Sequence, residues 1–219
     1  MLTYGVVRDD TEALISLLKK HEALNNEKYY YEIRNLDRDP ETFSSLSKTE
    51  KAARIIYLNK TGYNGLYRVN SKGHFNVPFG RYRNPPICEE AALLGVSRYL
   101  NSGAIQITNT DFERAVASAD KDSFVYFDPP YHSAKKSGFA CYQADGFGER
   151  EQERLRDLVM ELTGRKVKCL LSNADTEYIR GLYNYDCFSI VSVEAKRTIN
   201  SNAAKRGNVG ELLIKNWKD

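Results

Sequence analysis

One stretch in the second half of the chain, FVYFDPPYHS at residues 124–133, combines the groups best suited to chemistry. The run 123–127 is short, apolar and aromatic, which predicts a strand buried on both faces. Asp128 would follow this strand at its carboxyl end, where open α/β sheets bind ligands. The next two residues are prolines, which lack amide donors and fix φ, so the turn is stiff and its carbonyls face outward. The stretch therefore predicts a rigid pair of hydrogen-bond acceptors.

A proline turn without a chemical role is the alternative reading of the same residues. It would be favoured for an isolated Asp-Pro pair, because that pair is a common turn signal. The full tetrapeptide Asp-Pro-Pro-Tyr at residues 128–131 favours the acceptor pair instead.

The elements that must position this turn alternate along the second half of the chain. The helix expected over 149–163 carries an apolar stripe of leucines and valine, which predicts a face packed on the core. A second helix is expected over about 175–182. The alternation predicts a mainly parallel sheet covered by helices. The expected strands are 104–108, 123–127, 167–171, 187–194 and 211–215.

The first half of the chain predicts helices and one hairpin. Leucines at helical spacing predict a helix over 10–21, and SKTEKAARIIYLNKTG predicts another that stops near Gly62. The stretch LYRVNSKGHFNV predicts a hairpin around residues 70–73. A further helix is expected from the ICEEAALLGVSRYLNSG stretch, whereas 22–46 is expected to be irregular or partly helical.

Composition narrows the function classes only a little. The net charge of +3 over 219 residues is too small to predict a nucleic-acid partner, so local clusters of charge must carry that argument. The four cysteines are far apart without a Cys-x-x-Cys pair, which predicts neither a zinc site nor a disulfide framework. The start of the chain has no leader-like pattern and no stretch reaches the length of a membrane span. We therefore expect a reduced, cytoplasmic protein.

Three motifs in order carry a resemblance to a known family. They are GYNGLYRVNSKGHFNVPFGRY from residue 62, DPPY from residue 128 and KRTINSNAAKRGNVGELL from residue 196. Together the chain resembles the adenine-specific DNA methyltransferases of the Dam type over nearly its whole length. The resemblance implies transfer of a methyl group from S-adenosylmethionine to the exocyclic amino group of adenine in double-stranded DNA, typically at GATC sites.

The chemistry of the tetrapeptide agrees with this resemblance. An aromatic amine is a poor nucleophile because its lone pair is delocalised, and two acceptors on its hydrogens pull it toward a tetrahedral geometry. The Asp128 carboxylate and the Pro129 carbonyl can supply these acceptors, already fixed before substrate binds. Pro130 stiffens the turn, and Tyr131 would stack on an adenine flipped out of the duplex. Direct displacement at the methyl carbon then gains mainly from approach and alignment.

The other two motifs are expected to bind DNA. Arg68 can contact a guanine edge with two hydrogen bonds, while Leu66 and Pro78 can touch a thymine methyl group. The resemblance implies that Tyr63 and Asn64 enter the DNA double helix beside the flipped base. A further set of residues is expected to contact DNA phosphates. The alternatives are that the hairpin arginines are merely solvated on the surface and that the downstream segment is a solvated basic loop. This set is Asn70, Arg81, Tyr82, Arg83, Lys196, Arg197, Lys205 and Arg206.

The cofactor site can be predicted only in part. Asp111 and Phe112 resemble a family position that meets the adenine of S-adenosylmethionine, with Asp128 at the methyl end, although an acid after a strand is as often a helix cap. The family also has a basic segment, a first strand with a glycine-rich loop and a second strand ending in an acid, none of which is found here. The single Gly-x-Gly, at 146–148, follows no strand and is not that loop.

The expected fold class is therefore an incomplete, Rossmann-like α/β methyltransferase fold with strands three to seven of seven. Residues 1–21 and 104–219 would form the catalytic domain, and 22–103 an inserted, mainly helical recognition domain with a β-hairpin. Without the first two strands, the strands at 104–108 and 123–127 would present bare edges. We expect the chain alone to be poorly stable unless a second polypeptide or a swapped protomer supplies the missing strands.

Three functions from different classes remain open at this point. The chain could be an active enzyme or the larger half of a split one, an inactive DNA-binding remnant, or a methyltransferase for RNA or a protein amide. Asp128 and the expected hairpin count against the last. Zinc-dependent deamination needs His-x-Glu and Pro-Cys-x-x-Cys patterns that His21, His74 and His132 do not form, so no metal is expected.

Overall fold

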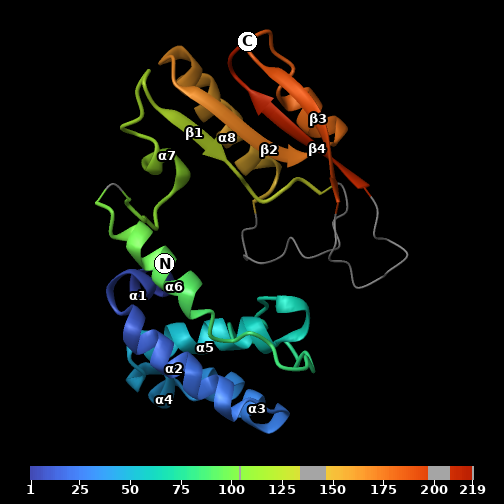
Figure 1. Cartoon of the computed structure of the whole chain (residues 1–219). Coiled ribbons are helices and arrows are strands. Elements are labelled where there is room, and N and C mark those ends of the chain that lie inside the picture. The colour runs from blue at the N-terminus through green and yellow to red at the C-terminus, as the bar shows by residue number, and fades with distance from the viewer. Residues whose placement is uncertain (104, 134–146, 197–207, 219) are drawn as a thin grey trace. The chain divides into compact units, whose positions relative to one another are not determined.

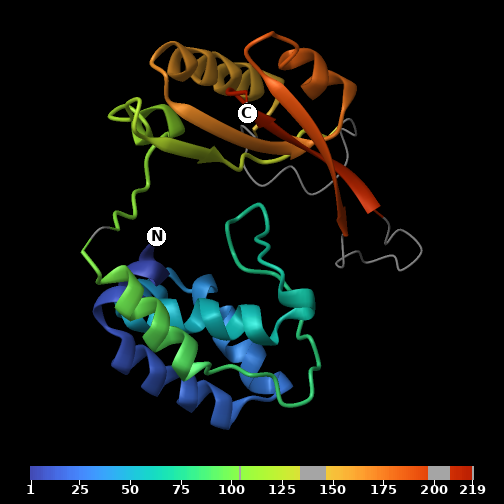
Figure 2. The same cartoon turned by 45° about the horizontal axis from the view of Figure 1, so that its top comes forward.

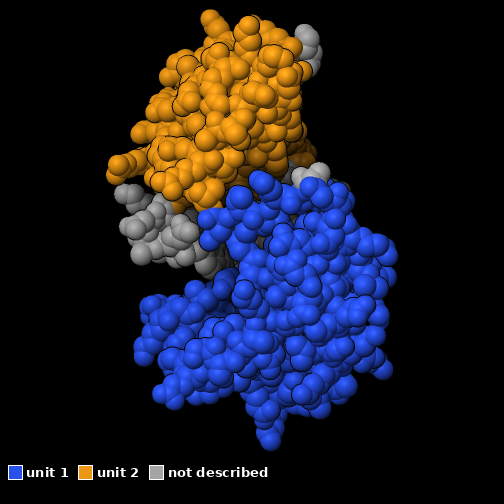
Figure 3. Space-filling view, turned by 90° about the vertical axis from the view of Figure 1, so that its left-hand side faces the viewer, with its two compact units in different colours: residues 1–109 blue, residues 110–219 orange. Residues whose placement is uncertain are grey.

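The computed structural model describes residues 1–103, 105–133, 147–196 and 208–218. The chain divides into two compact units, residues 1–109 and residues 110–219, which Figure 3 shows in different colours. The first consists of helices and turns, and the second of a sheet with helices (Figures 1 and 2). Among the described residues, no helix is both long enough and apolar enough to cross a membrane.

The first unit is built around a central helix, α5. Its amino end is fixed by a capping box, in which the Ser47 side chain accepts from the backbone of Glu50 and the Glu50 side chain accepts from the backbone of Ser47. Its buried face contributes residues with no exposed surface, among them Ala53, Tyr57 and Leu58. The elements of this unit are α1 (Leu2–Asp9), α2 (Thr11–Leu24), α3 (Glu27–Asn35), η1 (Leu36–Arg38), α4 (Pro40–Ser45), α5 (Lys48–Thr61), η2 (Tyr63–Gly65) and α6 (Glu90–Leu100).

Residues 1–21 lie in this helical unit, which differs from the expected domain division. Val6 and Val7 of α1 and Leu14 and Leu18 of α2 are buried in the same core as α5. The leucine spacing predicted an apolar helix face, but spacing does not say which core that face will join.

The segment after α6 also differs from expectation. Residues 105–108, predicted to be a strand, pair with no strand among the described residues. Ile105 and Ile107 instead pack against the core of the first unit. A short alternating apolar run can satisfy its burial against helices as well as within a sheet, so the strand prediction was wrong here.

The second unit holds a four-stranded sheet in the order β1-β2-β4-β3. Strands β1 and β2 are parallel, with Phe127 opposite Leu171. Strand β4 lies between β2 and β3 and is antiparallel to both. The elements of this unit are α7 (Phe112–Ala115), β1 (Phe124–Phe127), α8 (Glu149–Gly164), β2 (Lys168–Ala174), α9 (Glu177–Leu182), β3 (Ser189–Lys196) and β4 (Asn208–Lys215).

The prediction of a mainly parallel sheet was therefore wrong, because only the β1–β2 pair is parallel among the described strands. The apolar runs marked the strands but carried no information on their direction. Helices α8 and α9 cover one face of the sheet (Figure 2), where Leu155 and Leu162 of α8 share a buried core with Phe127, Leu171 and other strand residues. This packing fixes the carboxyl ends of β1 and β2 side by side.

Candidate active site

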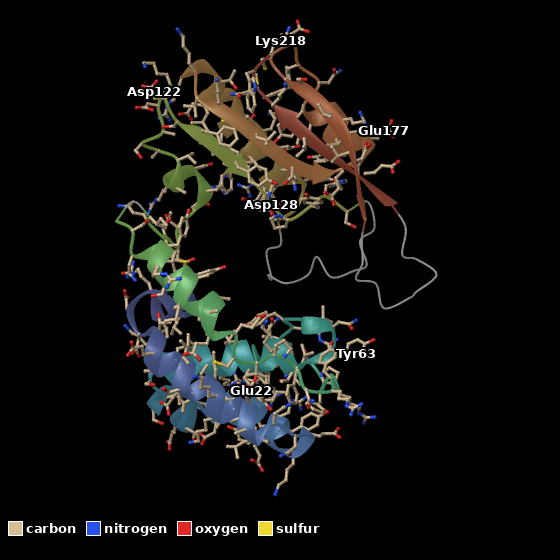
Figure 4. All side chains as sticks on the ribbon, viewed as in Figure 1. Glu22, Tyr63, Asp122, Asp128, Glu177 and Lys218 are labelled. Atoms are coloured by element: carbon tan, nitrogen blue, oxygen red, sulfur yellow. The ribbon has the colours of Figure 1, made fainter. Side chains whose placement is uncertain are left out.

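Asp128 lies immediately after the last residue of β1, at the edge predicted from the sequence (Figure 4). Its Oδ1 accepts a hydrogen bond of 2.8 Å from the Ser172 hydroxyl on β2. Ser172 is buried and its Oγ in turn accepts from the Tyr126 hydroxyl at 3.0 Å. Within the described part of the chain, the other oxygen of Asp128 accepts no hydrogen bond. One carboxylate oxygen is thus held in place while the exposed side chain keeps a second acceptor available.

The two residues after the prolines are held by contacts from β2, α9 and β4. Tyr131 donates from its hydroxyl to Glu211 Oε2 at 3.4 Å. Burial raises the pKa of Tyr131, and the nearby carboxylates of Glu211 and Asp128 add to the effect, so the phenol stays neutral at physiological pH. The ring of His132 stacks on Tyr178 with 4.7 Å between centroids, and its Nδ1 lies 3.0 Å from the Thr176 hydroxyl.

A pocket of about 350 Å³ opens beside this turn. Its size is within the range of small-molecule sites, and its aromatic walls suit a flat heterocycle. Phe112 and Phe147 contribute two of these walls, with ring centroids 6.0 Å apart. The structure therefore brings Phe112, Asp128, Pro129 and Pro130 to one cavity. Its lining is Phe112, Ala115, Val116, Val125, Tyr126, Phe127, Asp128, Pro129, Pro130, Phe147 and Leu155.

Asp111 is held close to this pocket by Arg154 of α8. Asp111 caps α7 by accepting from the Glu113 amide at 3.0 Å, so the helix-cap reading describes its position. Its Oδ1 also accepts from Arg154 at 2.6 Å, and the same guanidinium pairs with Glu113 and Glu151. This guanidinium holds the pKa of Asp111 below its usual range. Arg154 also lies 4.4 Å above the Phe112 ring, so one side chain contacts both Asp111 and Phe112, two of the three expected cofactor residues.

The predicted hairpin residues form a separate surface on the first unit. The turn at residues 70–73 is formed as expected, with the Asn70 amide donating to the His74 carbonyl at 2.9 Å. The Asn70 side chain accepts from the amides of Lys72 and His74, so it shapes the turn itself. Arg68 donates to the Asn76 side chain at 2.7 Å and to its carbonyl at 3.1 Å, which holds the guanidinium across the hairpin.

A second cluster on this unit gathers around the η2 turn. Tyr63, labelled in Figure 4, is exposed, and its amide donates to the Pro78 carbonyl at 2.9 Å. Asn64 adopts a positive φ of 53° and donates its amide to the Tyr82 hydroxyl at 2.7 Å. Unlike the exposed Tyr63, Leu66 is partly buried and packs against the core of the unit.

The remaining basic residues predicted to bind phosphate have fewer contacts with the rest of the described chain. Arg81 also has a positive φ, of 55°, and lies 3.8 Å from Glu27 with most of its side chain exposed. Arg83 is exposed. Lys196 is the last residue of β3 and pairs with Asn208 of β4. Arg197, Lys205 and Arg206 lie outside the described residues.

Sequence reasoning missed several residues that hold the site, including Ser172, Asn173, Gln152 and Arg154. A signal for two of them was present, because Ser172 and Asn173 follow the apolar run 167–171 directly. Parallel strands end at the same sheet edge, so polar residues after two such runs are expected to meet. Arg154 carried no comparable signal among the charged residues of α8, and Gln152 is a polar residue on the buried face that Leu155 and Val159 share.

The chain is similar to known proteins over most of its length. Residues 1–199 match the family model of the D12 class N6 adenine-specific DNA methyltransferases. The chain is 41% identical to the type II methyltransferase M1.LlaDCHI of Lactococcus lactis subsp. cremoris, over 98% of this chain and 75% of the relative. It is 41% identical to the type II methyltransferase M.MjaIII of Methanocaldococcus jannaschii, over 99% and 76% of the two chains.

A DNA adenine methylase of Haemophilus influenzae is 36% identical over 84% of this chain and 62% of its own length. The two type II methyltransferases match almost the whole chain, and so both units of the structure. The chain belongs to the D12 class of N6 adenine-specific DNA methyltransferases.

Proposed function

We propose that the chain transfers the methyl group of S-adenosylmethionine to the exocyclic amine of an adenine flipped out of a GATC site. The observation that carries the proposal is the placement of Asp128. Its exposed carboxylate follows β1, is fixed at one oxygen by Ser172 and borders an apolar pocket of about 350 Å³. The family supports adenine methylation in general, and the target sequence and the base flipping are the proposed refinements.

The residues around the pocket fit the cofactor. The rings of Phe112 and Phe147 suit a flat adenine moiety, and Asp111, held by Arg154, is an acceptor that can lie beside its amino group. Asp128 and Pro129 line the same pocket and would lie toward the methyl end. When bound, S-adenosylmethionine supplies an electrophilic methyl group attached to a sulfonium.

Asp128 and Pro129 prepare the amine of the substrate adenine for attack. The Asp128 carboxylate accepts one N–H and the Pro129 carbonyl accepts the other, which localises the lone pair on nitrogen. Both acceptors stabilise the positive charge that develops as the new N–C bond forms. The amine loses one proton overall, and the exposed Asp128 carboxylate can pass that proton to solvent.

The aromatic and proline residues of the turn hold the base. Tyr131 stacks on the flipped adenine, which offsets part of the stacking lost in the duplex. The Pro130 ring restricts the backbone so that the Pro129 carbonyl keeps its direction. The neutral Tyr131 phenol, bonded to Glu211, keeps its ring from turning away from the substrate.

The recognition surface is proposed to lie within residues 22–103. Arg68 reads a guanine, with Asn76 holding its guanidinium ready, while Pro78 and Leu66 meet thymine methyl groups. The exposed Tyr63 and Asn64 enter the duplex beside the flipped base.

Phosphate binding is proposed for the set Asn70, Arg81, Tyr82, Arg83, Lys196, Arg197, Lys205 and Arg206. Phosphate contacts of this kind position the protein without reading sequence. They also make DNA affinity fall as salt concentration rises, because bound cations are released from the DNA.

The exposed edge of β1 supports a further part of the proposal. Among the described residues, β1 pairs only with β2, and Phe124 and Tyr126 on β1 are 59% and 52% exposed. An apolar strand edge of this kind needs a partner. We propose that a second polypeptide or a swapped protomer supplies backbone to this edge, and that the isolated chain associates or loses cooperativity without it.

The experiment for the proposed function is a methyl-transfer assay with tritiated S-adenosylmethionine. The native chain is incubated with duplexes that differ only in one GATC site or a permuted site, and the labelled nucleoside is identified after digestion. We expect N6-methyladenine from the GATC duplex alone. Equal labelling of both duplexes would reject the GATC assignment, and no labelled adenine in either would leave a DNA-binding remnant or one half of a split enzyme.

A further inference from the structure

Two fully buried amide side chains lie beneath the Asp-Pro-Pro-Tyr turn. Gln152 comes from α8 and Asn173 from the end of β2, and neither has exposed surface. Asn173 Nδ2 donates to Gln152 Oε1 at 3.0 Å. Buried amides destabilise a fold unless their polar atoms have partners. The partners of this pair therefore show what the pair does.

The two ends of the pair bond to the backbone of the turn. Asn173 Oδ1 accepts from the His132 amide and from the Ala174 amide, both at 2.9 Å. Gln152 Nε2 donates to the Pro130 carbonyl, also at 2.9 Å. The pair thus connects two backbone groups on either side of Tyr131.

The orientation of both amides follows from these backbone groups. A backbone N–H can only donate, so the Asn173 oxygen must face His132 and the Asn173 nitrogen must face Gln152. Gln152 must then present its oxygen to Asn173 and its nitrogen to Pro130. The backbone carbonyl of Pro130 can only accept, so the direction of the whole chain of bonds is consistent at both ends. No other arrangement of the two amides satisfies every partner.

We propose that Gln152 and Asn173 are positioning residues for methyl transfer. The prolines fix φ at residues 129 and 130, and the amide pair fixes the carbonyl of Pro130 and the amide of His132. Within the described residues, the Pro129 carbonyl accepts no hydrogen bond, so it stays available while its neighbours are held. This inference rests on the proposed function, in which Asp128 and the Pro129 carbonyl are the two acceptors.

The competing explanation is that Gln152 and Asn173 only stabilise the core. The substitution Gln152→Glu distinguishes this explanation from a role in positioning the turn. The ionised carboxylate of this variant accepts from Asn173 but sets its second oxygen against the Pro130 carbonyl, whereas the protonated form donates to that carbonyl. Burial raises the pKa of such a carboxyl. We expect kcat at saturating substrates to fall about tenfold to a hundredfold at pH 8 and to recover, relative to the native chain, as the pH falls toward 5.5.

A second variant and a matched control keep the test independent of folding. Gln152→Met keeps the side-chain length but removes both bonds, and Leu158→Met changes the buried face of the same helix without touching the turn. We expect Gln152→Met to lower kcat with little change in KM for either substrate, and Leu158→Met to change neither. A fall in kcat of equal size in both variants would overturn the positioning role.

Hydrogen exchange of the peptide spanning residues 124–133 gives a readout that needs no turnover. The amide of His132 is expected to exchange faster in Gln152→Met than in the native chain, and to be unchanged in Leu158→Met. If the native chain transfers no methyl group, the proposed function fails while this comparison still tests the network. Unchanged exchange and an unchanged pH profile in the Gln152 variants would refute the inference.

Discussion

The Ser172 hydroxyl on β2 donates a 2.8 Å hydrogen bond to Asp128, the first residue after β1. The two residues are 44 positions apart in the chain and meet because β1 and β2 are parallel and end at the same sheet edge. The bond orients an otherwise exposed carboxylate. It is therefore the contact through which the sheet directs the proposed chemistry.

Ser172→Ala is expected to slow methyl transfer because it frees the carboxylate to rotate. Hydrogen bonds to charged groups contribute about 1.5–3 kcal/mol, which corresponds to a loss in kcat of roughly tenfold to a hundredfold. Tyr126→Phe, which keeps the Ser172–Asp128 bond, should cost less, and Ser16→Ala on α2 should cost nothing. Single-turnover rates of the four proteins would show this order, and equal rates for the native chain and Ser172→Ala would refute it.

Arg154→Gln is expected to weaken cofactor binding rather than the chemical step. The guanidinium holds Asp111 and lies over the Phe112 ring, so its loss leaves three neighbouring carboxylates without their shared cation. Calorimetric titration with S-adenosylmethionine should give a larger Kd, with kcat at saturating cofactor almost unchanged.

Arg165→Gln is the matched control for Arg154, since it removes a guanidinium that pairs with Glu161 just beyond the end of the same helix. Its Kd for S-adenosylmethionine should stay within about twofold of the native value. A larger effect from Arg165→Gln than from Arg154→Gln would contradict the assignment of Asp111 and Phe112 to the cofactor site.

Arg68→Ala is expected to relax discrimination at one base pair of the target. Loss of a bidentate guanine contact costs about 1–3 kcal/mol of discrimination against the wrong base. Competition binding with duplexes substituted at each position of GATC measures this directly. Lys72→Ala, at the exposed hairpin tip, is the control, and a uniform loss of affinity for every sequence in Arg68→Ala would instead make Arg68 a phosphate contact.

The first unit is expected to lose stability as the pH falls from about 6.5 toward 4. His21 stacks on Tyr57 with centroids 4.8 Å apart, and burial, aided by the Lys20 charge, lowers the pKa of His21 to about 4. In the unfolded chain His21 has its ordinary pKa near 6.5, so between about pH 4 and 6.5 the unfolded chain binds more protons than the folded chain. The free energy of unfolding therefore rises with pH across this range.

Urea unfolding followed by the helical circular dichroism signal at several pH values would measure this effect. His21→Gln should flatten the dependence between about pH 6.5 and 4, because it removes the titrating ring. His74→Gln, a histidine of the hairpin, serves as the control. An unchanged pH dependence in His21→Gln would show that other groups cause the acid loss.

Much of the second unit was predictable because its signals are local. The leucine stripe of α8, the strands β1 and β2 and the acid after β1 are each encoded within a few neighbouring residues, and the structure contains all of them. The prediction that β1 is buried on both faces was wrong, because Phe124 and Tyr126 on one face are exposed while Phe127 on the other is buried. The capped start of α5 and the turn at residues 70–73 were predictable for the same reason.

The features that could not be predicted depend on contacts between residues far apart in the sequence, which set the direction of each strand and the core that each helix packs in. The sequence of residues 208–215 does not indicate that β4 lies antiparallel between β2 and β3. The spacing of the leucines in α2 likewise does not indicate which core they pack in. Gln152 is one polar residue among many on α8, and only its burial against the Pro130 carbonyl identifies it.

Asp128 is proposed to activate the substrate amine. The most direct test compares single-turnover methyl transfer to a GATC duplex by the native chain and by Asp128→Ala, with duplex affinity measured by fluorescence anisotropy. Transfer by Asp128→Ala is expected to fall by about 10²–10³-fold while affinity for the duplex is retained. Transfer by Asp128→Ala at a rate close to native would remove Asp128 from the mechanism.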